Sequence, residues 1–232
     1  MVSHILGALY GTAVLVMWVG AASWPLGPYR LALFFAGLGW LGAALAWGLG
    51  RPAVLGKTAR GEVPRGRWPI LWSWWLFRYV LYELERSWTG ESPLDEVVEG
   101  VWIGRWLIRG ERRAMDPSGW AVLDLTAELP ATFQGEVYLS VPVLEHTPPT
   151  PDQLDSVDAF MSAQRAAGRR IYVHCAMGHT RSATAVVAWR LRQDPELSLD
   201  QSIADLQRAR PRTGIGSAHR AVLNTWRVSP RA

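Results

Sequence analysis

The sequence predicts an α/β domain, a central sheet flanked by helices, preceded by a two-helix transmembrane hairpin. Two observations lead to this reading. The first fifty residues are almost free of charge, and from about residue 94 short β-like apolar runs alternate with helical segments. We therefore divide the chain into a transmembrane hairpin (1–50), a basic juxtamembrane segment with an interfacial amphipathic helix (51–93) and the α/β domain (94–232).

The hairpin is predicted from two uncharged stretches, Ile5–Tyr29 and Leu31–Gly50, which only Arg30 separates. A spanning helix needs about 20 mostly apolar residues, and both stretches supply them once the Pro/Gly-rich turn is assigned to the connection. We expect helices over roughly 5–23 and 30–49. A cleaved signal peptide is the first alternative, but no Lys or Arg precedes the run and a second run follows directly. Two buried core helices are the second alternative, which two adjacent uncharged runs disfavour.

Charge and cysteine content predict where the rest of the chain lies. Five basic residues follow the second span against the single acid Glu62, so the positive-inside bias predicts an integral membrane protein with both termini and residues 94–232 in the cytoplasm. The single cysteine excludes an intramolecular disulfide and agrees with a reducing compartment. The net charge is +4, but no zinc-type Cys/His spacing and no basic–aromatic stripe supports nucleic-acid binding. The five basic residues are Arg51, Lys57, Arg60, Arg65 and Arg67.

Residues 68–88 are rich in aromatic side chains, and charges enter only from Arg78 onward. We expect an amphipathic helix that lies at the membrane interface and continues toward the α/β domain. The alternative is a third span, which the charges in its second half disfavour.

The α/β domain is expected to contain four strands, a capped helix and three C-terminal helices. The helix Pro151–Ala167 has Thr150 as its N-cap, Pro151 at its first position and Gly168 at its end. Pro195 and Pro211 separate the C-terminal helices. The strands are predicted at 101–104, 121–125, 137–141 and 171–173, and the last three helices at roughly 181–193, 199–208 and 216–227.

The chain's only cysteine, Cys175, lies between the strand-like run Ile171–Val173 and a helix-like run that begins at Ser182. A cysteine is a nucleophile only as thiolate, and backbone N–H groups at a helix start attract both a thiolate and a phosphate. Six residues on, Arg181 offers a planar fork that can hold two phosphate oxygens. This spacing predicts a phosphate-binding nucleophile site. The alternative is an inert buried cysteine at a strand end.

The remaining loop positions fit the same chemistry. Gly178 permits a tight turn, Ser182 can donate a hydrogen bond to the sulfur, and His174 is expected to orient the loop rather than to transfer protons. The side chains and backbone that complete the phosphate-binding loop are Ala176, Met177, Gly178, His179 and Thr180.

The motif His174-Cys175-x5-Arg181-Ser182 resembles the signature loop of the cysteine-dependent protein tyrosine phosphatases, in their dual-specificity branch. The segments Val122–Glu128 and Tyr138–Glu145 are similar to strands of that branch, and the resemblance covers roughly residues 95–228. It implies a dual-specificity phosphatase-like sheet and hydrolysis of phosphomonoesters through a cysteinyl-phosphate intermediate. It implies neither a cofactor nor a metal. Low-molecular-weight phosphatases and rhodaneses match less well.

The resemblance departs from its pattern at the general acid, because Glu145 stands where the family has an aspartate. A glutamate can protonate the leaving oxygen and then activate water, but its carboxyl group lies one methylene further from the backbone. Asp152 and Asp155 are the nearby alternatives, on the predicted helix. Asp124 is expected to be structural.

The sequence therefore predicts a membrane-anchored phosphatase whose partners are the lipid bilayer and a phosphorylated protein or a phospholipid substrate. The alternative is a catalytically weak phosphatase-like module that binds phosphorylated partners at the membrane. The intact Cys175 and Arg181 disfavour it, and the atypical Glu145 slightly favours it. A third possibility, in which the hairpin is the functional part, is disfavoured because uncharged spans offer little for conduction or transport.

Overall fold

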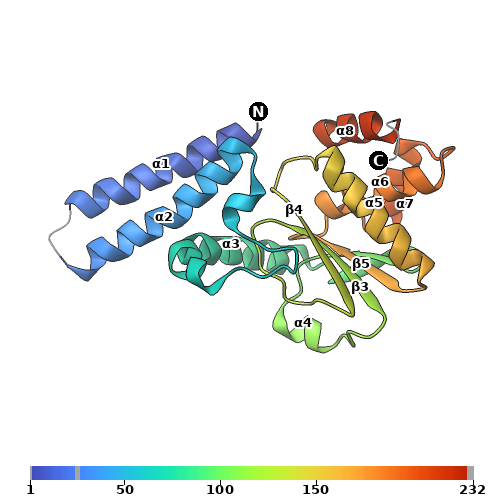
Figure 1. The fold of residues 1–232 in the computed structure, drawn as a ribbon, viewed down its shortest axis with the longest axis horizontal. Helices are drawn as coiled ribbons and strands as arrows, with labels where there is room; N and C mark the ends of the chain where they lie inside the picture. Colours follow the sequence, from blue (N-terminus) through green and yellow to red (C-terminus); the bar gives the residue numbers. More distant parts are fainter. Residues whose placement is uncertain (1, 24–26, 229–232) are drawn as a thin grey trace.

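The structure is a computed structural model that describes residues 2–23 and 27–228. Figure 1 shows two parts: a helical hairpin that projects to the left, and an α/β domain on the right, with helix α3 between them. The hairpin consists of α1 (Val2–Ser23) and α2 (Pro28–Leu49), close to the predicted 5–23 and 30–49. Both helices are long and apolar enough to cross a membrane by length and composition.

Small residues let α1 and α2 approach closely near the α/β domain. A Cβ on Gly7 would lie 2.8 Å from the backbone nitrogen of Gly48, so only glycine fits there. At the far end, the ring of Trp18 stacks on Phe34 and its indole N–H donates to the Phe34 carbonyl at 3.3 Å. Close backbone contact, ring stacking and this hydrogen bond thus hold the two helices together.

Helix α3 (Trp68–Thr89) follows two short 3-10 turns, η1 (Pro52–Leu55) and η2 (Arg65–Arg67), and packs against α2. Leu71, Trp74, Arg78 and Tyr82 recur every three or four residues and are buried, so they form the inner face of α3. Trp74 is fully buried among aromatic rings of the hairpin. The predicted helix 68–88 is therefore present, and one side of it is buried in protein contacts.

The α/β domain is built on a five-stranded sheet of order β1-β2-β5-β3-β4. Strand β5 lies at its centre, parallel to β2 and β3, while β1 pairs antiparallel with β2 at one edge. The strand β1 and a short helix α4 (Arg109–Arg113) were not expected from the sequence. The strands are β1 (Leu94–Val98), β2 (Val101–Gly104), β3 (Trp120–Thr126), β4 (Val137–Val143) and β5 (Arg170–His174).

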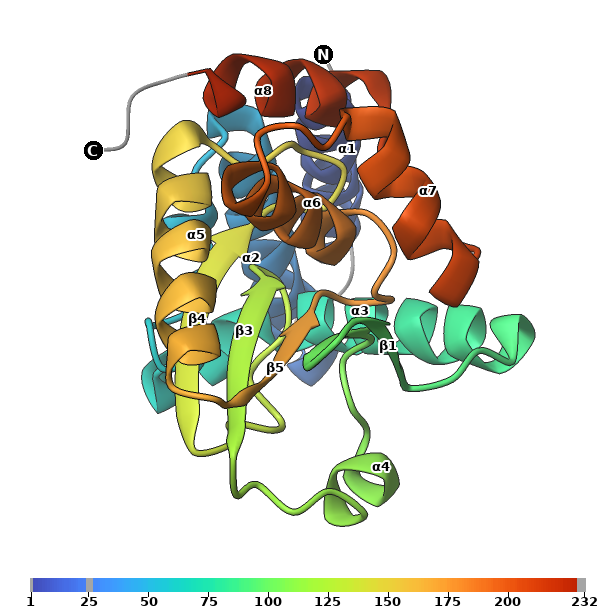
Figure 2. The same cartoon turned by 90° about the vertical axis from the view of Figure 1, so that its right-hand side faces the viewer.

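Four helices cover the other side of the sheet from α3, as Figures 1 and 2 show. Thr150 caps α5 as predicted: its hydroxyl accepts from the Gln153 backbone N–H, and the Gln153 side chain accepts from the Thr150 N–H. Helix α6 is buried over most of its length and packs on β5 and α5. The four are α5 (Pro151–Ala166), α6 (Arg181–Gln193), α7 (Leu199–Ala209) and α8 (Ser217–Arg227), in close agreement with the sequence.

Candidate active site

The cysteine loop joins the carboxyl end of the central strand β5 to the start of α6. Strands β2 and β3 pair with β5 up to His174, the residue before the cysteine. The loop therefore starts from the most constrained point of the sheet and ends at a helix N-terminus. Such a position aims unpaired backbone N–H groups at one region of space, which suits an anion.

The thiol of Cys175 accepts hydrogen bonds within this loop. The backbone N–H of Gly178 donates to Sγ at 3.3 Å, and the hydroxyl of Ser182 lies 3.5 Å from Sγ. Gly178 adopts a φ of 76°, and a Cβ there would collide with the carbonyl of Gly104 in β2. The glycine is thus required both by its backbone conformation and by the space available.

The loop carbonyls are held by donors from outside the loop. The Trp106 N–H donates to the Ala176 carbonyl at 2.8 Å, and the guanidinium of Arg210 donates to the carbonyls of Met177 (2.9 Å) and Gly178 (3.0 Å). Arg210 is itself buried and paired with Asp95 at 2.5 Å. With the carbonyls bound elsewhere, the loop can present its N–H groups to a phosphate.

Arg181 is held in a fixed orientation by a buried carboxylate. Its two terminal nitrogens donate to the two oxygens of Glu128 at 2.9 and 2.6 Å, and one of them also donates to the Val143 carbonyl at 2.8 Å. Burial alone would raise the pKa of Glu128, but the charge and hydrogen bonds of Arg181 outweigh it and lower the pKa. Glu128 therefore stays ionised and fixes the guanidinium at the loop.

Glu145 lines the same pocket as Cys175 and Arg181. One carboxylate oxygen, Oε2, pairs with Arg78 of α3 at 2.7 Å, and the other, Oε1, lies 3.9 Å from Arg181. The alternative acids lie elsewhere. Asp155 accepts a hydrogen bond from the Trp226 indole on α8, and neither Asp152 nor Asp155 lines the pocket.

His174 and Asp124 belong to a buried network beneath the loop. The His174 ring stacks on Tyr172, its Nδ1 lies 3.3 Å from the Cys175 carbonyl, and its Nε2 lies 3.8 Å from Asp124. Burial lowers the pKa of His174, which keeps the ring neutral. This geometry suits a residue that orients the loop.

Lys57 extends this network from the segment between the hairpin and α3. Its ammonium group donates to Asp124 at 2.6 Å and to the carbonyl and hydroxyl oxygens of Thr126 at 2.8 and 2.6 Å. Asp124 also accepts from the Thr126 N–H and from the Tyr138 hydroxyl. Burial by itself would raise the pKa of Asp124, but Lys57, His174 and these hydrogen bonds lower it well below its usual value. The residue is thus a buried, ionised structural group.

The pocket over the cysteine has a volume of about 380 Å³ and draws on several parts of the chain. Its wall includes Met177, His179 and Thr180 from the loop, and His179 pairs with Glu91 at 2.7 Å. Glu85 of α3 also lines the pocket, and burial raises the pKa of its carboxyl group. The other lining residues are Val2, Glu145, His146, Cys175, Ala176, Arg181, Gly216 and His219.

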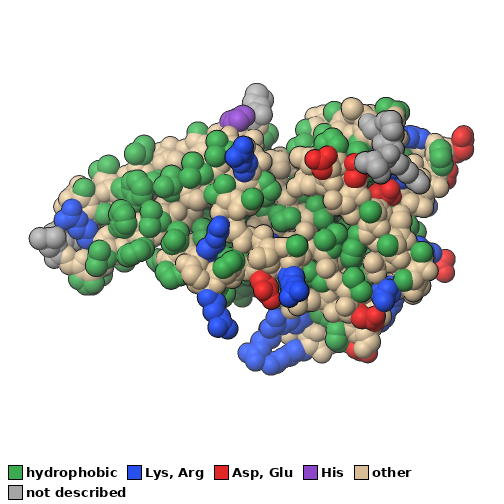
Figure 3. Space-filling model, viewed as in Figure 1, with side chains coloured by type: hydrophobic (Ala, Val, Ile, Leu, Met, Phe, Trp, Pro, Cys, Tyr) green, Lys and Arg blue, Asp and Glu red, His purple; other side chains and the backbone are tan. Residues whose placement is uncertain are grey.

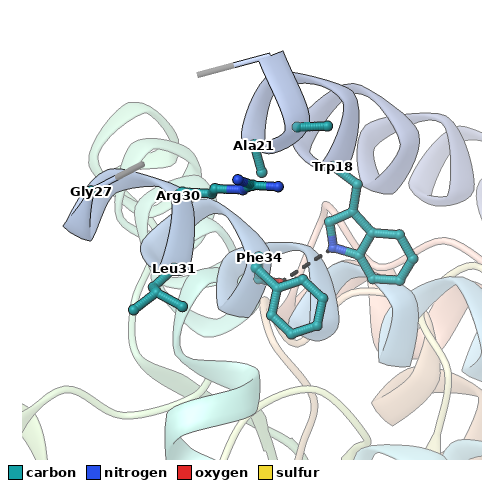
Figure 4. Close-up of a pocket in the computed structure, with 7 residues that line it drawn as sticks. Trp18, Ala21, Gly27, Arg30, Leu31 and Phe34 are labelled. Carbon is teal, nitrogen blue, oxygen red and sulfur yellow. Dashed lines mark hydrogen bonds between the residues drawn. The ribbon is translucent and has the colours of Figure 1, made fainter. Parts of the chain in front are cut away.

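A larger cavity, of about 750 Å³, lies at the far end of the hairpin (Figure 4). Its described lining residues are apolar or glycine apart from Arg30, with Trp18 and Phe34 among them. This lining contains no nucleophile and no acid, so the cavity over Cys175 is the candidate for chemistry.

Several residues of the site were not singled out from the sequence. Glu128 was noticed only as part of a strand motif, and Lys57 only as one of the basic residues that follow the second span. Glu85 and Arg210 were assigned no role. The burial of Arg78 could have been predicted from the sequence of α3. Arg78 shares the three-to-four-residue spacing of Trp74 and Tyr82 and so belongs to the buried face of the helix. For Lys57 and Arg210 no local pattern marks a buried cation.

Comparison with known proteins finds similarity to phosphatases of the dual-specificity type. Residues 120–229 match the family model described as the dual specificity phosphatase catalytic domain. The chain is 44% identical over 52 residues to human protein phosphatase Slingshot homolog 3, and 26% identical over 118 residues to mouse dual specificity protein phosphatase 1. These matches cover 22% and 50% of this chain, but only 8% and 32% of those proteins.

Solved structures share the fold at low sequence identity. The chain superposes on the crystal structure of PTPMT1 in complex with PI(5)P with a TM-score of 0.52 at 18% identity, covering 59% of this chain and 95% of that one. It superposes on a mouse putative dual specificity phosphatase complexed with zinc tungstate with a TM-score of 0.53 at 23% identity, covering 60% and 89%. The hairpin and α3 lie outside residues 120–229, the part of the chain that the family model matches.

Proposed function

Because the chain belongs to the dual-specificity branch of the cysteine-dependent phosphatases, we propose that it hydrolyses phosphomonoesters at a membrane surface through a cysteinyl-phosphate intermediate. The observation that carries the chemistry is the convergence of Cys175, the Glu128-anchored Arg181 and Glu145 on one pocket. The roles of these residues follow from their positions and from the chemistry of phosphoryl transfer.

In the first step, Sγ of Cys175 attacks phosphorus, and the bond from phosphorus to the leaving oxygen breaks. Arg181 and the loop N–H groups hold the non-bridging oxygens. The Glu145 carboxyl group gives its proton to the leaving oxygen, which releases an alcohol or phenol.

In the second step, water attacks phosphorus as the S–P bond breaks, and the Glu145 carboxylate takes the proton from that water. The Ser182 hydroxyl, 3.5 Å from Sγ, donates a hydrogen bond to the departing thiolate. Inorganic phosphate leaves, and the enzyme returns to its starting state.

Membrane attachment is supported by the exposed apolar surface of the hairpin. Figure 3 shows hydrophobic side chains along its length. Leu15, Val16 and Val19 of α1 are each more than 60% exposed, which is costly in water and favourable in lipid. The outer face of α3 adds exposed apolar side chains, as an interfacial helix would. These are Trp68, Ile70, Trp72, Leu76, Tyr79, Val80, Leu81, Leu84 and Trp88.

The pocket lies beside the end of the hairpin that is nearest the domain, because Val2 at the start of α1 lines it. With both spans in the bilayer and the domain in the cytoplasm, the pocket opens close to the cytoplasmic membrane surface. This favours substrates presented there, either a phospholipid headgroup or a membrane-bound phosphoprotein. That the same fold was solved with PI(5)P in PTPMT1 supports including phosphoinositides among the substrates tested.

The test is turnover by the full chain in detergent micelles and in vesicles. An aryl phosphate should be hydrolysed, and Cys175→Ser should abolish turnover. Phosphate binding without turnover at any pH would favour a phosphate-binding module instead. Turnover of a phospholipid and of a phosphopeptide, each presented on vesicles, is compared to decide which of the two is the substrate class. Extraction of the chain from vesicles by alkaline carbonate would refute the spanning hairpin.

A further inference from the structure

The loop that carries Glu145 is held by side chains from outside the matched phosphatase domain. The indole N–H of Trp47, at the end of α2, donates to the Glu145 backbone carbonyl at 3.1 Å. A terminal nitrogen of Arg78, on α3, pairs with Glu145 Oε2 at 2.7 Å. One contact fixes the backbone of the acid residue and the other fixes its carboxylate.

Both donors are themselves rigidly placed. Trp47 is 1% exposed and packs edge-on against Tyr10 and Trp74, in the aromatic cluster between the hairpin and α3. Arg78 is 8% exposed and lies on the inner face of α3. A donor that has already lost its rotamer freedom can fix a partner with little further entropy cost.

Arg78 also belongs to an alternating cluster of four charges. The same nitrogen that pairs with Glu145 lies 3.7 Å from Glu128, and Arg181 faces the same two carboxylates at 2.6 and 3.9 Å. Arg78 therefore holds Oε2 of Glu145, while Oε1 stays on the side of Arg181 and the pocket. In this arrangement Oε1 can carry the transferred proton, and Arg78 stabilises the carboxylate that remains after the transfer.

The acid loop needs such support from outside. The residue after Glu145, His146, adopts a φ of 61°, which is uncommon for a residue with a side chain. Glutamate also has one more rotatable bond than the aspartate that usually serves in this family, so its carboxylate is harder to place. External contacts at both the backbone and the carboxylate compensate for that freedom.

We propose that Trp47 and Arg78 are positioning residues for Glu145, so that the appended hairpin and α3 complete the catalytic apparatus of the phosphatase domain. This inference rests on the proposed function. It predicts that the proton-transfer step, and not phosphate binding, depends on contacts made by the N-terminal region.

The experiment compares Arg78→Met, Arg78→Lys and Trp47→Phe in the full chain, in detergent micelles. Two substrates are used, phenyl phosphate with a poor leaving group and 2,4-dinitrophenyl phosphate with a good one. Because general acid catalysis contributes about 10²–10⁴-fold, Arg78→Met should lower kcat/KM for phenyl phosphate by about 10–100-fold and that for the activated ester by less than about threefold. The ratio kcat/KM is used because it reports the first step alone, whereas the second step is the same for both esters. Arg78→Lys should recover part of the loss, and Trp47→Phe should show the same selectivity with a smaller loss.

The decisive measurement repeats these substitutions in the Glu145→Gln background. If Arg78 acts through Glu145, Arg78→Met should then change kcat/KM for phenyl phosphate by less than about twofold, since coupled residues are not additive. Competitive inhibition by orthovanadate should be unchanged, which also shows that each variant is folded. The matched control is Arg86→Met on the same helix, whose partner is Glu83 and which should leave both rates unchanged.

Three outcomes would overturn the inference. Arg78→Met could lower both rates equally, its effect could persist in the Glu145→Gln background, or it could weaken vanadate binding, which would mean that Arg78 acts through Glu128 and Arg181. In a fourth outcome Cys175→Ser is inactive, but the separate variant Glu145→Gln lowers the rates with both substrates equally. This would remove the positioning role and leave the phosphatase assignment intact. Full activity of Cys175→Ser would instead refute the proposed function itself.

Discussion

Replacement of Lys57 by methionine should destabilise the protein strongly, although Lys57 lies outside the matched domain. Its ammonium group is buried and is 2.6 Å from Asp124, which is fully buried. Removing one member of a buried ion pair leaves an uncompensated charge and typically costs about 3–5 kcal/mol. Three donors to Asp124 remain, the Thr126 N–H, the Thr126 hydroxyl and the Tyr138 hydroxyl. We therefore expect a loss near the lower limit, about 3 kcal/mol.

For a chain of this size, each kcal/mol shifts Tm by about 2–4 °C, so Lys57→Met should lower Tm by about 6–12 °C. The assay is thermal unfolding in detergent micelles, followed by the near-ultraviolet circular dichroism of the tryptophans. Arg60→Met, at an exposed position in the same segment, is the control and should change Tm by less than about 2 °C.

A double variant separates loss of the charge pair from loss of packing. Lys57→Met combined with Asp124→Asn removes both charges and keeps the shape of the acid, so it should be more stable than Lys57→Met alone. The reasoning is wrong if Lys57→Met costs less than about 1 kcal/mol, or if the double variant is no more stable than the single one.

Three further predictions concern the loop, the α5 cap and pH. Gly178→Ala should lower kcat/KM at least about 100-fold and reduce vanadate affinity, because an alanine at a φ of 76° that also collides with β2 would distort the phosphate-binding loop. A vanadate affinity equal to that of the unsubstituted chain would contradict this. Thr150→Ala should cost about 1 kcal/mol in urea unfolding with kcat/KM unchanged, since only a helix cap is lost; a cost near zero would exclude the cap. The pKa values of Asp124 and Glu128 are lower in the folded protein than in the unfolded chain, so these groups contribute stability that is present above about pH 4 and lost as the pH falls below it, because the unfolded carboxyl groups take up protons first. Urea midpoints at pH 7, 5 and 3 measure this loss of stability. The loss between pH 7 and pH 3 should be smaller in Lys57→Met than in the unsubstituted chain.

Much of the fold could be predicted because local patterns determine it. The buried run of β3, the cap at Thr150 and the prolines between the last helices each leave a local signature, and the structure agrees with them. Strand β1 was missed because Asp95 and Glu96 interrupt its apolar residues, and it lies at the sheet edge. Helix α4 is a single polar turn with no apolar periodicity.

The site could be predicted only in part, for a different reason. The loop from His174 to Ser182 is contiguous in sequence, so its residue types and spacing were visible together. The contacts of Arg78 and Trp47 with Glu145 join segments that are far apart in the chain, and no spacing rule connects them. The hairpin was therefore interpreted as an anchor alone, whereas the structure shows it in contact with the loop that carries Glu145.

The burial of Lys57 also has a practical consequence, because it is the only lysine of the chain. In the folded protein no side-chain amine is open to acylating reagents, so amine-directed crosslinkers and lysine acylation will find no accessible side chain. Lys57 can therefore be acylated only when the segment between the hairpin and α3 detaches from β3, so its modification reports that local opening. Pulsed acylation followed by mass spectrometry would read this opening equilibrium at a single, built-in position, without any introduced probe.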